Sequence, residues 1–89
     1  MKVAILGMGS KECLDLQIQL QDMLNELHSE ASVKISDDID LFIQYKIKKT
    51  PALLVNQTII PNSELKDLVG IRQILKRENA IHDNNQEQE

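Results

Sequence analysis

The apolar residues at the start of the chain predict a strand followed by a helix. Residues 2–6 are apolar from Val3 onward and stop at Gly7, as in a short buried strand. Residues 14–21 alternate between apolar and polar side chains, which over a short window is typical of a half-buried strand. A longer window shows an apolar stripe at helical spacing, made of Cys13, Leu16, Leu20, Leu24 and Leu27. Because the polar residues between them are mostly good helix formers, we predict a helix over residues 10–28.

A second strand and a second helix are predicted over the next twenty or so positions. Residues 31–35 are a candidate strand with Val33 and Ile35 on one face. Ser36 is the expected N-terminal cap of the helix that follows, with Asp37 and Asp38 in its first turn, where they complement the helix dipole. The side chains expected to face inward from this helix are those of Ile39, Phe42 and Ile43. Three lysines lie at or beyond its end, namely Lys46, Lys48 and Lys49.

The pair Thr50-Pro51 interrupts the helical pattern, and two further strands are predicted after it. Residues 52–55 are fully apolar and form a candidate buried strand. Residues 58–60 follow after Asn56-Gln57, which predicts a tight hairpin, although glycine would be the usual residue at position 57.

Two interpretations of the last helix stay open. Either Asn62 or Ser63 caps a long helix that ends near Arg77, or a loop precedes a shorter helix capped by Asp67. Gly70 disfavours the long helix, because glycine costs roughly 1 kcal/mol relative to alanine inside a helix. In the shorter version the residues that face the sheet are Leu68, Ile71, Ile74 and Leu75. The stretch 78–89 is polar, so we expect one folded domain over residues 1–77 and a disordered tail.

Composition and charge narrow the classes of function. The 89 residues include one Phe, one Tyr and no Trp, so the single core is aliphatic. The net charge of −4 comes from the last stretch, residues 78–89, and the remainder has neither the basic excess nor the interleaved aromatics of a nucleic-acid surface. No apolar segment is long enough to cross a bilayer, the start does not resemble a signal peptide, and one cysteine makes no internal disulfide. We therefore expect a cytoplasmic protein with no membrane or nucleic-acid partner.

The junction at residues 7–13 is where an α/β protein would place chemistry. Reactive groups collect beyond the carboxyl end of a strand, and the start of the next helix favours a thiolate. Ser10 is the expected helix cap, and no histidine or acid is positioned to make it a nucleophile. The stripe places Cys13 on the core-facing side, which favours a small core residue over a reactive thiol. With one cysteine and two distant histidines, we expect neither a metal site nor a cofactor.

Two segments resemble a known family. Residues 3–9, read Val-Ala-Ile-Leu-Gly-Met-Gly, lead to positions 10 and 13, and residues 45–56 contain Thr-Pro-Ala-Leu before an apolar strand and an Asn turn. With the order of elements, they are similar to the small thioredoxin-like proteins often called redox-active disulfide protein 2. The resemblance covers nearly all of residues 1–77, and its Thr-Pro-Ala-Leu segment is more specific than the Gly-x-Gly. It implies an α/β fold, βαβαββα, with a mixed four-stranded sheet in the order 2-1-3-4 and helices on both faces.

The resemblance also implies a redox site with one substitution. Members of the family carry Cys-x-x-Cys, in which the first cysteine attacks a substrate disulfide and the second resolves the mixed disulfide. By position, Ser10 replaces the attacking cysteine and Cys13 matches the resolving one. Thr50 and Pro51 match the cis-proline loop, whose extended backbone pairs with substrate peptide. Lys46 stands where relatives often have glycine.

Three hypotheses about function follow from the serine, because a hydroxyl stays protonated at neutral pH and does not attack disulfides. The first is a thioredoxin-like protein of the thiol-disulfide oxidoreductase family with a degenerate Ser10 site, which keeps its binding surface but little or no redox turnover. The second is a non-redox interaction module that binds a protein at the Thr50-Pro51 edge or the helix surface. The third is that the serine was introduced, and the native chain is an active dithiol oxidoreductase. The three lysines are interpreted as a solvated helix end, which could also favour an acidic partner.

Overall fold

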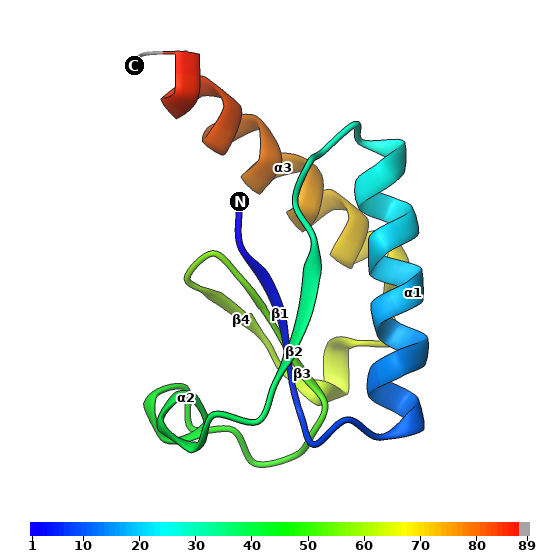
Figure 1. Ribbon diagram of the computed structural model, residues 1–89, viewed down its shortest axis with the longest axis vertical. Coiled ribbons are helices and arrows are strands. Elements are labelled where there is room, and N and C mark those ends of the chain that lie inside the picture. Colours follow the sequence, from blue (N-terminus) through cyan, green and yellow to red (C-terminus); the bar gives the residue numbers. More distant parts are fainter. Residues whose placement is uncertain (88–89) are drawn as a thin grey trace.

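A computed structural model describes the backbone of residues 1–87 and the side chains of residues 1–80, and its centre is a mixed four-stranded sheet (Figure 1). The strands lie in the order β2-β1-β3-β4, with β1 parallel to β2 and antiparallel to β3, and with β3 antiparallel to β4. The expected α/β class and strand order are thereby confirmed. The elements are β1 (Val3–Leu6), α1 (Lys11–Glu26), β2 (Val33–Ser36), α2 (Ile39–Gln44), β3 (Ala52–Val55), β4 (Thr58–Ile60), the 3₁₀ turn η1 (Asn62–Glu64) and α3 (Leu68–Glu87).

One face of the sheet carries the main core. Residues paired across neighbouring strands point to the same side of a sheet. One such row consists of Ile35, Ile5, Leu53 and Ile60. Against this face pack buried residues of α1 and α3, among them Leu20, Leu24, Ile71 and Leu75. The opposite face is less well covered, because α2 has only six residues and none of them is buried. Figure 1 shows α1 and α3 together on one side of the sheet and α2 on the other.

Helix α1 has the predicted cap. Two glutamines in the stretch where apolar and polar side chains alternate, Gln17 and Gln21, contact the neighbouring strand β2. Ser10 is the N-cap, and the helix covers Lys11–Glu26, slightly shorter than predicted. The side chain of Gln17 donates to the carbonyl of Val33 at 2.8 Å, and Gln21 accepts from the Val33 N–H at 3.2 Å. Polar residues at these positions therefore satisfy backbone groups at the open edge of β2, which would otherwise be free to pair with another chain.

The prediction for α2 was wrong in its cap and in two of the three side chains expected to face inward, whereas Phe42 is partly buried as expected. Ser36 is the last residue of β2, and Asp38 caps the helix by accepting from the Asp40 N–H at 3.0 Å. Ile39 and Ile43, expected to face inward, are 68% and 71% exposed. The helix is apolar on two sides, and the side with Leu41, Phe42 and Tyr45 is the partly buried one.

Helix α3 begins as in the second of the two interpretations, after a loop that contains η1. Asp67 accepts from the Gly70 N–H at 3.0 Å, and a Cβ at position 70 would collide with that carboxylate. Glycine at position 70 therefore leaves room for the cap. Ile71 and Leu75 are buried as expected, whereas Leu68 is exposed.

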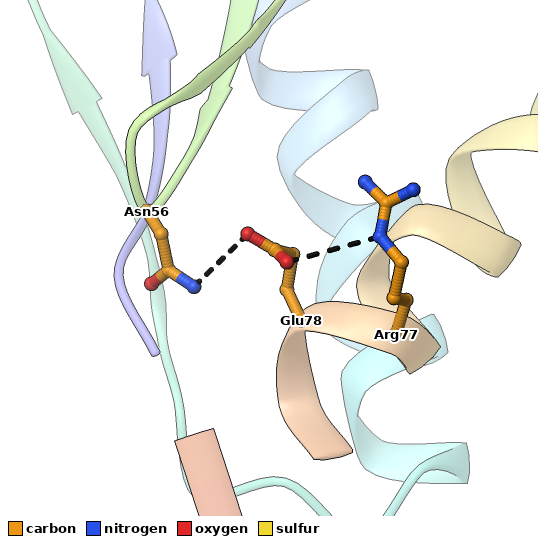
Figure 2. A network of polar contacts seen from close by, with 3 residues as sticks. All are labelled: Asn56, Arg77 and Glu78. Atoms are coloured by element: carbon orange, nitrogen blue, oxygen red, sulfur yellow. Dashed lines mark hydrogen bonds and ion pairs between the residues drawn. The ribbon is translucent and has the colours of Figure 1, made fainter. Parts of the chain in front are cut away.

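The helix then continues to Glu87, where a disordered tail was expected from residue 78. Glu78 contacts the hairpin turn (Figure 2): its carboxylate accepts from Asn56 Nδ2 at 3.4 Å and lies 3.8 Å from Arg77 Nε. Asn56, in the left-handed conformation with φ 54°, also accepts from the Lys2 N–H at 2.9 Å. The polar composition of the stretch gave no sign of this long-range contact. Residues 88–89 of the predicted tail lie outside the described residues.

Candidate functional site

The junction between β1 and α1 brings the two predicted site residues of this segment together. β1 ends at Leu6, and the N–H of Gly7 donates to the carbonyl of Ser36 at 2.9 Å. Ser10 then caps α1 by accepting from the Cys13 N–H at 3.4 Å, and its hydroxyl lies 3.4 Å from Cys13 Sγ. The two side chains are therefore neighbours across one helical turn, as the Ser-x-x-Cys spacing requires.

The two positions differ sharply in their access to solvent. Ser10 is exposed, whereas Cys13 is 1% exposed and belongs to the core cluster. The sequence-based interpretation of Cys13 as a small core residue agrees with this burial. A nucleophile must reach its substrate, and a thiol that is this deeply buried does so only when the structure opens locally.

Gly7 connects the junction to the Thr50-Pro51 loop. A Cβ added at position 7 would lie 2.5 Å from Cys13 Sγ and 3.7 Å from Pro51 Cβ. Both side chains therefore pack against the bare backbone of this glycine, which holds Cys13 and Pro51 close to each other. From the sequence, Gly7 was interpreted as the end of a strand, and no local pattern indicated that Cys13 and Pro51 both pack against it.

The Thr50-Pro51 bond is cis, as the family resemblance implies. Pro51 is buried, and its carbonyl accepts from Asn62 Nδ2 at 2.9 Å, which attaches the loop to η1. Thr50 is exposed, and within the described part of the chain its backbone N–H and carbonyl make no hydrogen bond. One side of the loop is therefore held by the fold while the other offers free backbone groups to solvent. Sequence reasoning considered Asn62 only as a helix cap and missed its contact with Pro51.

A pocket of about 410 Å³, which we call the lysine pocket, lies beside this loop. Its charged lining residues are Lys46, Lys48 and Lys49, and its apolar lining includes Ile47, Ala52 and Ile59. None of the three ammonium groups forms an ion pair with a described residue. The pocket therefore combines unneutralised positive charge with an apolar floor provided by the less covered face of the sheet.

The end of α2 determines where Lys46 lies. The Lys46 N–H donates to the Ile43 carbonyl at 3.2 Å, and the Ile47 N–H donates to the Phe42 carbonyl at 2.9 Å. This pair of bonds is a Schellman motif, in which the residue after the cap adopts the left-handed conformation that glycine prefers. Lys46 adopts it with φ 53°, at a position where members of the resembled family often have glycine.

A second hollow of about 450 Å³ lies across Pro51 from the lysine pocket, against the first turns of α1. It shares Lys49 and Asn62 with the lysine pocket, but its lining also contains Glu12 and Asp15. The loop thus separates a hollow of mixed charge from one whose charged side chains are all basic.

Other kinds of site receive no support from the side chains that the structure places. Within the described residues, no group of three or more His, Cys, Asp and Glu side chains is arranged to hold a metal ion. No helix in the described part of the chain is long and apolar enough to cross a membrane. Comparisons with protein-family models, with curated proteins and with solved structures found no significant match.

Proposed function

We propose that this chain is a thioredoxin-like protein of the thiol-disulfide oxidoreductase family with a degenerate active site, which binds a protein or peptide with little or no redox turnover. The observation that carries the proposal is the grouping of three residues: Ser10 lies 3.4 Å from Cys13 Sγ, and Cys13 and Pro51 both pack against Gly7. Ser10 stands at the exposed start of α1, in the place of the attacking cysteine of the resembled family.

The chemistry of the two side chains supports the loss of turnover. A two-thiol cycle needs one exposed thiolate that attacks and a second thiol that resolves the mixed disulfide. Here the exposed position carries a hydroxyl, and the only thiol is buried in the core. A disulfide substrate would therefore meet no nucleophile of sufficient reactivity at this surface.

The Thr50-Pro51 loop supports the retained binding. The Thr50 N–H and carbonyl, which have no partner among the described residues, can pair with an extended peptide as a short added strand. The Asn62 side chain and the buried Pro51 ring hold the loop in place before any ligand arrives. Less ordering is then needed on binding, which favours affinity.

The variant Ser10→Cys tests this assignment. With dithiothreitol as reductant, the introduced thiolate should attack an insulin disulfide, forming a mixed disulfide and releasing one insulin thiolate. Cys13 should then attack the sulfur at position 10, releasing the second insulin thiolate and leaving a 10–13 disulfide that dithiothreitol reduces. We expect insulin reduction well above the dithiothreitol background for Ser10→Cys, and none above it for the unsubstituted chain or for Ser10→Ala.

The double variant Ser10→Cys, Cys13→Ala separates the two steps of this cycle. It should accumulate a mixed disulfide with insulin, visible as a mass increase that dithiothreitol removes, without catalytic turnover. Reduction of insulin by the unsubstituted chain would contradict the degenerate site. An inactive Ser10→Cys variant that is folded and forms no mixed disulfide would contradict the assignment to the family.

A further inference from the structure

We propose that the lysine pocket recognises an extended polypeptide segment in which an apolar side chain is flanked by carboxylates. This specificity rests on the binding role proposed above for the Thr50-Pro51 loop, and it names the class of ligand that the loop would take. The apolar side chain would enter the pocket, and the carboxylates would lie against its lysines.

Charge is the first observation behind this inference. Lys46, Lys48 and Lys49 line the pocket, no acidic side chain does, and none of the three has a carboxylate partner among the described residues. The hollow on the other side of Pro51 contains Glu12 and Asp15. A ligand that follows the loop therefore meets uncompensated positive charge on one side only, which favours acidic residues there.

The apolar floor is the second observation. Ala52 is buried, Ile47 and Ile59 are half-buried, and the six-residue α2 is too short to cover this face of the sheet. The volume of about 410 Å³ lies within the range of ligand pockets, which combine an apolar lining with a few polar groups that fix orientation. A ligand that was only a charged chain would leave this floor unused, so the segment should also carry an apolar side chain.

The exposed backbone of Thr50 is the third observation, and it selects an extended polypeptide. Its N–H and carbonyl make no hydrogen bond within the described part of the chain and lie beside Lys49 in sequence. A polypeptide strand offers the complementary carbonyl and N–H at the spacing that such pairing requires, whereas a nucleic acid does not.

The experiment uses fluorescence anisotropy with a fluorescein-labelled ten-residue peptide that has one central leucine flanked on both sides by aspartate and glutamate. A matched peptide carries asparagine and glutamine in their place, and a labelled ten-nucleotide single strand of DNA provides charge without a peptide backbone. We expect binding of the acidic peptide that weakens with salt, and much weaker binding of the other two probes. Each change of Lys46, Lys48 or Lys49 to alanine should weaken binding roughly three- to fivefold.

Two matched controls separate a role in binding from an effect on folding. Lys46→Gly removes the side chain and also relieves the left-handed backbone, so it should raise the melting temperature while it weakens peptide binding. His28 occupies the equivalent left-handed position after α1, with φ 57°, so His28→Gly should raise the melting temperature without changing the affinity. Lys76→Ala, on the exposed side of α3, removes one positive charge elsewhere and should also leave the affinity unchanged.

Equal affinity for the acidic and neutral peptides would overturn the inference about charge and leave the proposed function intact. Tighter binding of the DNA strand than of the acidic peptide would overturn the class of ligand. If no probe binds, the inference fails, and the insulin assay with Ser10→Cys then shows independently whether the proposed function fails with it.

Discussion

The two sides of Pro51 differ in what they offer to a ligand. On the side of α1, the thiol of Cys13 is packed against Gly7 and the core. On the side of α2, Thr50 and the lysine pocket face solvent, and their backbone groups and charges have no partner among the described residues. The thiol on the first side is buried, whereas the backbone groups and lysines on the second side are open to solvent. This contrast supports the proposed binding function over redox turnover.

The largest expected effect concerns the closed side, in the reaction of Cys13 with iodoacetamide. Because the thiol is 1% exposed, alkylation requires local opening, and we expect it to be on the order of a hundredfold or more slower in the native chain than in urea. The matched control is Ser10→Cys, Cys13→Ala, which moves the single thiol three residues to an exposed position and should react rapidly. Equal rates of alkylation for the thiols at positions 10 and 13 would contradict the burial of Cys13.

The packing of Gly7 gives the second prediction. Gly7→Ala places a Cβ 2.5 Å from Cys13 Sγ, and we expect a loss of about 1–3 kcal/mol in the free energy of unfolding, measured with urea. Pro51 is at an ordinary contact distance, so the sulfur is the principal obstacle. In a Cys13→Ala background, the same substitution should cost less than about 1 kcal/mol, because the colliding atom is absent. An equal cost in both backgrounds would show that Gly7 is required for a reason other than this contact.

Sequence reasoning was most successful where a local signal and the hydrophobic period agreed. Thr50-Pro51 marked the start of β3, the run at residues 52–55 gave its bounds, and Ser10 was identified as a cap. It was wrong for α2, because a short helix with apolar residues on both sides does not show which side packs. Ile43, which was expected to face inward, is exposed.

Other features of the fold come from contacts between residues distant in sequence. Nothing near Glu78 in the sequence indicates that its carboxylate meets Asn56, and the polar composition does not show that α3 continues past residue 77. For the candidate site, spacing and the family resemblance placed Ser10, Cys13 and Pro51 together. The contact of Gly7 with two of them, and the hydrogen bond from Asn62 to Pro51, arise from packing that no local pattern encodes.

The smallest of these effects concerns the open side and the bond from Asn62 to Pro51. Asn62→Ala removes a 2.9 Å hydrogen bond to a backbone carbonyl, and we expect the free energy of unfolding to fall by about 1 kcal/mol. The side chain of its exposed neighbour Ser63 makes no hydrogen bond with any residue that the structure describes, so Ser63→Ala should change stability by less than about 0.5 kcal/mol.

Peptide binding and alkylation of Cys13, both measured on Asn62→Ala, distinguish the two sides of the site. Because Asn62 holds the loop but does not contact the thiol, its loss should weaken binding of the acidic peptide while leaving the slow alkylation of Cys13 unchanged. Faster alkylation in Asn62→Ala would mean that the loop also controls access to the sulfur. In that case the two sides open together, and the binding surface and the buried thiol form one cooperative unit, since local opening free energies follow such units.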